Sequence, residues 1–163
     1  MILSSVSARW SIRMVESAWR SRRLAVFTAF LLAACSDSTG PSLFELAQKR
    51  ALWQSQNLHF YTIEETISCF CAYSGQPIAI QVDADTVTSV HLVATGQEIS
   101  KQGWQTVPQL FDYIEQLIET SDYTVKVRFD PSFGHPTFIE YSCGPNIADC
   151  GSSTTLRLLT RLD

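Results

Sequence analysis

Positive charge is scarce over most of this 163-residue sequence. The chain has 12 Lys and Arg against 16 Asp and Glu, but five of the arginines fall within residues 1–34, beside a single acid, Glu16. Residues 35–163 therefore carry seven basic and fifteen acidic side chains, a formal charge of −8. Because contacts of Lys and Arg with phosphate supply most of the affinity for nucleic acids, this balance argues against DNA or RNA as a partner. It predicts a surface that is acidic throughout, without a basic patch.

Long apolar runs are also lacking. The uncharged run at residues 24–34 (LAVFTAFLLAA) has 11 residues, whereas a membrane-spanning helix needs about 20. Arg20, Arg22 and Arg23 precede this run, and small residues end it. A basic start, a short apolar segment and small residues at the end are typical of a secretory signal, which predicts a signal peptide over residues 1–34.

Residues 32–35 (LAAC) resemble the lipobox of bacterial lipoproteins, in which the cysteine becomes the lipid-modified N-terminus. This resemblance predicts a lipid on Cys35 that anchors the protein to the membrane. The alternative is a secreted protein in which Cys35 is unmodified. With a lipid on Cys35, residues 35–42 would be a polar tether, and residues 43–163 would form one domain that is long enough to bury a core. An aspartate directly after the cysteine retains such lipoproteins at the inner membrane. Here the aspartate is one place later, at Asp37, so we expect the outer membrane, facing the periplasm.

Recognisable catalytic motifs are missing as well. The chain has no G-x-S-x-G elbow, no P-loop and no dinucleotide-binding fingerprint. Glu64 and Glu65 are adjacent on a predicted strand, so they point to opposite faces and cannot act as one catalytic pair. Asp83 and Asp85 are too few oxygen ligands for a calcium loop. We therefore expect a protein that is not an enzyme and needs no cofactor or metal. It would bind or scaffold an envelope protein partner at the membrane surface.

Hydrophobic periodicity predicts an α+β domain. One helix is expected over residues 42–57, with a capping box formed by Ser42 and Glu45, and a second helix after Thr106, with Pro108 in its first turn. Alternating patterns predict strands at residues 60–70, 77–82, 86–93, 123–129, 137–142 and 154–162. The order α-β-β-β-α-β-β-β indicates an antiparallel sheet with both helices on one face. The uncovered face would be the contact surface.

Four cysteines follow Cys35, and an even number in an exported domain indicates disulfides. Cys69 and Cys71 would lie about 7 Å apart on a regular strand, so a bond between them requires a bulge or a turn. Cys143 and Cys150 flank a short loop. We favour the pairs 69–71 and 143–150, with two cross-links between the segments as the alternative.

Two chemical roles compete with structural disulfides. A thiol–disulfide redox protein would use Cys69 and Cys71, although no Lys or Arg nearby in the sequence would lower their pKa. A soft metal would need these thiolates and a histidine, such as His59, His91 or His135. The oxidising compartment favours structural disulfides over both.

Several stretches together resemble one family, the bacterial lipoproteins with the domain of unknown function DUF6174. The matching pieces are residues 52–53 (LW) with Tyr61 downstream, 68–71 (SCFC), the hairpin at residues 82–90, 106–107 (TV), 110–115 (LFDYIE) and 129–137 (FDPSFGHPT). The last piece contains a turn with Gly134 suited to a positive φ and His135 expected to be partly exposed. The full set of motif residues in this turn is Asp130, Pro131, Phe133, Gly134, His135 and Pro136. The resemblance implies fold and compartment but no activity, since the family has none assigned.

Overall fold

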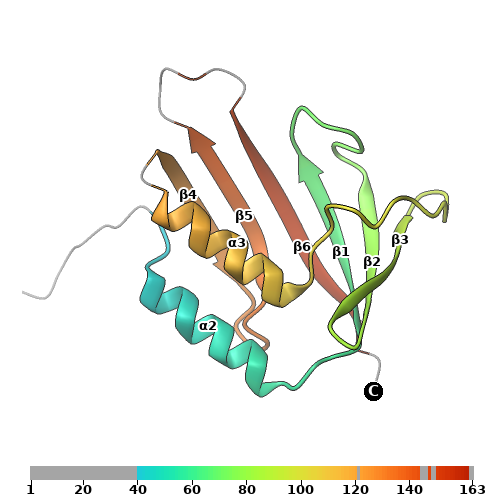
Figure 1. The fold of residues 1–163 in the computed structure, drawn as a ribbon, viewed down its shortest axis with the longest axis horizontal. Helices are drawn as coiled ribbons and strands as arrows, with labels where there is room; N and C mark the ends of the chain where they lie inside the picture. Colours follow the sequence, from blue (N-terminus) through green and yellow to red (C-terminus); the bar gives the residue numbers. More distant parts are fainter. Residues whose placement is uncertain (1–39, 121, 144–146, 148–149, 162–163) are drawn as a thin grey trace, which may run out of the picture. The chain divides into compact units, whose positions relative to one another are not determined.

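The computed structural model describes residues 40–120, 122–143, 147 and 150–161, which form an α+β fold. Two helices, α2 (Leu43–Ser55) and α3 (Val107–Glu119), accompany six strands. The strands are β1 (Tyr61–Ser68), β2 (Pro77–Asp83), β3 (Thr86–Leu92), β4 (Tyr123–Phe129), β5 (Pro136–Cys143) and β6 (Gly151–Arg161). Both helices lie over the same face of the sheet (Figure 1).

The six strands form one sheet in the order β3-β2-β1-β6-β5-β4, and every neighbouring pair is antiparallel. The predicted meander of the first three strands is confirmed. The chain order does not carry over to the second half of the sheet, because β6 lies between β1 and β5. The last strand therefore joins the two halves of the sheet at its centre (Figure 1).

The helix-covered face of the sheet forms the core. Alternate residues of each strand point to this face, since side chains along a strand alternate between its two faces. The buried strand residues are Tyr61, Ile63, Ile78, Ile80, Val82, Val90, Leu92, Val125, Ile139 and Leu156, and they meet Leu46 and Trp53 of α2 and Val107, Leu110, Phe111, Ile114 and Leu117 of α3. Burial of such side chains stabilises a fold by about 1.5–3 kcal/mol each.

The helix starts differ from the sequence prediction in one respect. Ser42 accepts a hydrogen bond from the Glu45 N–H, as expected. The reciprocal capping box, however, is found at α3, where Thr106 accepts from the Gln109 N–H and the Gln109 side chain accepts from the Thr106 N–H. Glutamine at the third helical position satisfies the backbone in the same way as glutamate. Arg50 then ties the helices together through Glu115, at 2.8 Å.

The ends of two strands also differ from the sequence prediction. β1 begins at Tyr61 and ends at Ser68, two residues short of the predicted end, because the chain turns at Cys69. β6 begins at Gly151, three residues earlier than expected. The predicted reversal between β2 and β3 is confirmed, since Ala84 and Asp85 both have positive φ, at 46° and 60°. Two successive residues with positive φ match the twist of a tight hairpin.

Candidate functional site

The predicted export features lie outside the described residues. The signal peptide at residues 1–34, the lipidation candidate Cys35 and the tether up to residue 39 all belong to this part of the chain. From Gly40 onward, the described helices are too short and too polar to cross a membrane.

The four remaining cysteines gather at one end of the sheet, which we call the disulfide end. It is the end where β1 and β5 finish and β6 begins, and it is uppermost in Figure 1. The structure pairs Cys69 with Cys71 and Cys143 with Cys150, with Cα separations of 5.3 and 5.6 Å. These are the pairs that the sequence favoured. The turn that permits the first pair is stabilised by Ser74, whose Oγ accepts from the Cys69 N–H at 3.2 Å.

Two of the three histidines proposed as metal ligands are at the other end of the sheet from these cysteines, while His91 lies near the end of β3, opposite Ala79. His59 and His135 lie at the opposite end of the sheet, which we call the hairpin end because the β2–β3 and β4–β5 turns are there. His59 Nδ1 is 2.6 Å from Asp85 Oδ2 in the β2–β3 turn. A metal site that combines Cys69 and Cys71 with either histidine is therefore wrong. Within the described ranges, no three His, Cys, Asp or Glu side chains cluster as metal ligands would.

The motif turn between β4 and β5 is organised by Asp130. Its Oδ1 accepts from the N–H groups of Ser132 and Phe133, both at 2.8 Å, and its backbone carbonyl accepts from the Gly134 N–H at 3.0 Å. Partial burial alone would raise the pKa of Asp130. The Phe133 and Ser132 N–H groups stabilise its charged form, however, so the pKa falls below its usual value. The turn is thus set by local hydrogen bonds that favour an ionised aspartate.

This turn packs directly onto α2. Gly134 has φ +82°, and a Cβ at this position would lie 2.5 Å from the Lys49 carbonyl oxygen. His135, next to it, is only 3% exposed and meets the Trp53 ring edge-on at 5.9 Å. The expectation of a partly exposed His135 is therefore wrong, because the close approach of α2 covers it.

Burial lowers the pKa of His135, with Asp130 opposing that shift, so the ring is neutral at pH 7. Its Nδ1 is buried and has no hydrogen-bond partner among the described residues. No cleft that we describe opens on it. The motif turn therefore attaches the β4–β5 hairpin to α2, and its residues act in the fold.

A cleft of about 360 Å³ lies at the hairpin end, beside the hydrogen-bonded side chains of His59 and Asp85. A histidine oriented by a carboxylate is the base of many nucleophilic sites. The other lining residues are Trp53, Gln54, Asn57, Leu58 and Pro108. None of them is a hydroxyl or thiol nucleophile, so this lining does not supply a catalytic set.

Glu65 is an acid that the sequence placed on the apolar face, and the structure buries it there. It is 6% exposed, and burial raises its pKa to about 7. The same burial raises the pKa of the nearby Tyr113, to which Tyr141 and Glu65 also contribute. The single interruption of an alternating apolar pattern was the sequence signal for this site. Glu65 therefore titrates near neutral pH, and burial accounts for the rise of its pKa.

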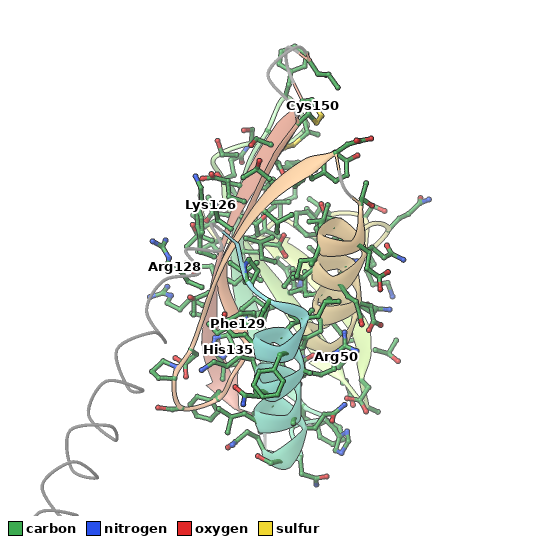
Figure 2. The ribbon with its side chains drawn as sticks, turned by 90° about the vertical axis from the view of Figure 1, so that its left-hand side faces the viewer. Arg50, Lys126, Arg128, Phe129, His135 and Cys150 are labelled. Atoms are coloured by element: carbon green, nitrogen blue, oxygen red, sulfur yellow. A yellow bond between two sulfur atoms is a disulfide. The ribbon has the colours of Figure 1, made fainter. Side chains whose placement is uncertain are left out.

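The sheet face away from the helices, the open face, presents ordered charges. Lys126 Nζ donates to Glu140 Oε1 at 2.6 Å across β4 and β5. Arg157 on β6 donates to both carboxylate oxygens of Glu64 on β1, each at 3.1 Å. Figure 2 shows Lys126 and Arg128 on this side of the sheet, while Phe129 and His135 lie on the helix side. These two ion pairs fix the positions of four charged side chains, one on each of four strands.

Next to the Lys126–Glu140 pair, Arg128 lies over an aromatic ring. Its guanidinium carbon is 4.3 Å from the centre of the Phe138 ring on the neighbouring strand. Lys126, Arg128 and Arg157 place three of the seven basic residues beyond position 34 on one face, together with the acids Glu64, Asp83 and Glu140. The basic residues of the domain are thus more concentrated on this face than an even distribution would make them. Pairing of distant strands, which the sequence does not show, brings these side chains together.

Comparison with known families gives one match. The model of a family of unknown function, DUF6174, matches residues 45–161. The match spans both helices from their first turns and reaches the last residue of β6. No curated protein and no solved structure matches the chain. Because the match covers most of the sequence, the chain belongs to the family of unknown function DUF6174.

Proposed function

We propose that this protein is a lipid-anchored lipoprotein of the bacterial envelope that binds a protein partner through the open face of its sheet. The observation that carries the binding role is the pair Arg128 and Phe138, a cation over a half-buried ring on the β4–β5 edge of the open face. Arginine and aromatic residues are the side chains most enriched at protein interfaces.

The flanking ion pairs support this role. Lys126 with Glu140 and Arg157 with Glu64 are exposed enough to contribute only about 0–1 kcal/mol each to stability. Their energetic effect on the fold is therefore small, while they fix the positions of charged groups around Arg128. A partner with a carboxylate opposite Arg128 and an apolar group beside Phe138 would complement this face.

The anchor part of the proposal comes from the sequence. A basic segment, an 11-residue apolar run and the stretch LAAC place Cys35 where lipoproteins are modified. The short polar tether then keeps the domain near the bilayer, in the periplasm and on the outer membrane. Lipid attachment raises the local concentration of the domain at that surface, so a partner there needs only modest affinity.

Site-specific photo-cross-linking in producing cells tests the binding role. A photoreactive residue replaces Thr155, which is exposed on β6 and opposite Phe138. The matched control carries it at Gln116, which is exposed on α3 on the other side of the domain. We expect a discrete protein adduct from position 155 and a weaker one, or none, from position 116.

The same sample tests the anchor, because the mass of the N-terminal peptide shows whether Cys35 carries lipid. Adducts only from position 116 would move the contact surface to the helices and contradict the open-face proposal. An unmodified Cys35 would contradict the anchor alone. The two parts of the proposal therefore fail separately.

Thiol–disulfide exchange is the second candidate function, because Cys71 is exposed at the disulfide end. A partner thiolate would attack one sulfur of the Cys69–Cys71 bond, form a mixed disulfide and release the other cysteine as a thiolate. Equilibration with glutathione buffers measures the reduction potential. A bond that opens while Cys143–Cys150 stays closed favours this function, and two bonds that resist reduction exclude it.

A further inference from the structure

Large apolar side chains are exposed at the disulfide end of the domain. Phe70 is fully exposed between the bonded Cys69 and Cys71, and Ile147 is exposed between Cys143 and Cys150. Tyr73 follows the first disulfide, Val93 follows β3, and Tyr123 begins β4 opposite Cys143. We call these five side chains the apolar tip: Phe70, Tyr73, Val93, Tyr123 and Ile147.

The antiparallel arrangement explains why these positions, which are far apart in the sequence, lie at one end of the sheet. β1, β3 and β5 end where β2, β4 and β6 begin, so all five residues stand at the same end of the sheet. The Val93 N–H donates to the Pro77 carbonyl at 3.0 Å, which fixes Val93 beside the start of β2. Among the described residues, the other exposed large apolar side chains are Phe60 and Leu159 at the hairpin end and Leu43 and Phe44 at the start of α2.

Leaving these side chains in water has an energetic cost. Burial of one Phe or Val side chain contributes about 1.5–3 kcal/mol relative to exposure. Clusters of this kind mark surfaces that contact a membrane or a partner. The two disulfides hold Phe70 and Ile147 in short closed loops, so little chain entropy is lost when they are buried.

The length and position of the tether favour the membrane over a protein partner as the surface that the apolar tip contacts. Gly40 is packed against the Val125 carbonyl, on the third residue of β4. Tyr123, in the apolar tip, is two residues or about 7 Å from that point along the strand. Residues 35–39 extend at most about 17 Å. A lipid on Cys35 therefore keeps the disulfide end within reach of the bilayer, while the hairpin end is farther from the attachment point.

We infer that the apolar tip rests in the interfacial layer of the bilayer that holds the anchor, which fixes the orientation of the domain. This inference rests on the proposed lipid on Cys35. Aromatic residues favour the headgroup boundary. Asp122 is exposed beside Tyr123, so a negative charge borders the apolar tip, which suits zwitterionic lipids better than anionic ones. The sheet then stands on its disulfide end, and the open face remains free to bind a partner.

Tryptophan fluorescence in vesicles tests the orientation. The full-length mature protein, purified from membranes, is reconstituted into phosphatidylcholine vesicles whose acyl chains carry bromine, a quencher of tryptophan. Phe70→Trp adds a reporter at the tip, and Phe60→Trp adds the matched control at the hairpin end, where Phe60 is 44% exposed. The unsubstituted protein gives the signal of Trp53 and Trp104. We expect the added fluorescence at position 70 to be quenched at least threefold more than that at position 60.

Ile147→Trp repeats the measurement from the second disulfide loop and covers a failure of the first variant to fold. Equal quenching at the tip and at position 60, or stronger quenching at position 60, would overturn the inference. The mass of the N-terminal peptide separates the two proposals. A lipid on Cys35 without tip quenching contradicts the orientation only, whereas a chain with neither lipid nor quenching contradicts both. Two results together would assign the tip to a protein partner and overturn the bilayer contact. They are the loss of the position-155 cross-link in Phe70→Ser and the absence of quenching in Phe70→Trp.

Discussion

Glu64 and Glu65 are neighbours on β1, and they show how differently the two faces of the sheet are built. Glu64 lies on the open face, where Arg157 donates two hydrogen bonds to it. Glu65 lies on the helix-covered face, where burial raises its pKa to about 7. On the open face, charged side chains are paired and exposed to water. On the covered face, Glu65 interrupts the apolar residues of β1 and is shielded from water. The covered face thus stabilises the fold, and the open face has side chains available for another role.

The largest difference between the faces is expected from two phenylalanines. Phe111 on α3 is completely buried and stacks on Phe129 at 6.2 Å, whereas Phe138 is half-buried under Arg128. Phe111→Ala should lower the free energy of unfolding by about 3–5 kcal/mol, because it leaves a cavity. Phe138→Ala should lower it by about 1 kcal/mol, since it removes mainly the contact with the guanidinium. Urea unfolding measures both, and similar losses would contradict the assignment of the two faces.

The attachment of the motif turn to α2 gives the next largest effect. Gly134→Ala should lower the free energy of unfolding by about 3 kcal/mol, because the positive φ is unfavourable and the new Cβ would collide with the Lys49 carbonyl. Gly96→Ala is the matched control, with φ +68° and nothing within 4 Å of the added Cβ. We expect it to cost about 1 kcal/mol. Equal costs would show that α2 does not press on the turn.

Glu65 makes the stability depend on pH. Its pKa rises from 4.5 unfolded to about 7 folded, so the folded state keeps a proton that the unfolded chain loses. The contribution of Glu65 is therefore fully favourable below about pH 4.5 and is lost as pH rises to 7, with a total change of about 3 kcal/mol. Glu65→Gln should raise the stability at pH 8 and flatten this part of the pH profile. A profile of unchanged slope would contradict the burial of an ionisable Glu65.

The matched variant on the other face should have the smallest effect. Glu64→Gln weakens the pair with Arg157, whose side chain is 67% exposed. Exposed pairs contribute about 0–1 kcal/mol, and salt screens them. We expect a loss below about 1 kcal/mol that shrinks further in 1 M NaCl. A loss as large as that of Phe111→Ala would show that the open face helps to stabilise the fold.

His135 acts in the opposite direction from Glu65. Burial holds its pKa below the usual 6.5, so the unfolded chain takes up a proton that the folded state refuses. Its contribution is complete above pH 6.5 and is lost as pH falls below that value. Replacement of His135 by Gln should therefore reduce the loss of stability on acidification between pH 6.5 and 5, which thermal unfolding at several pH values measures.

The secondary structure was largely accessible from the sequence because it depends on local patterns. The alternation in residues 61–68 and the helical spacing of Val107, Leu110 and Ile114 are both readable along the chain. What the sequence does not show is contact between distant segments. The insertion of β6 between β1 and β5 brings Arg157 to Glu64, which is 93 residues away.

His135 illustrates the same limit at a single residue. Its neighbours Gly134 and Pro136 correctly predicted a turn, and turns are usually exposed. The burial of His135 comes from Trp53 on α2, more than eighty residues earlier in the chain. Glu65 was more informative, because an acid within an apolar alternation is visible in the sequence even when its partners are not.

The division of roles between the two faces, in which the open face binds a partner and the covered face stabilises the fold, can be tested directly. The most direct measurement compares the cross-link yield at position 155 in two charge-reversal variants, Arg128→Glu on the open face and Lys101→Glu elsewhere, with the melting temperature of each as a check on folding. We predict that Arg128→Glu lowers the yield at least tenfold while the melting temperature falls by only about 4 °C, and that Lys101→Glu leaves both unchanged. Equal yields in the two variants would contradict the claim.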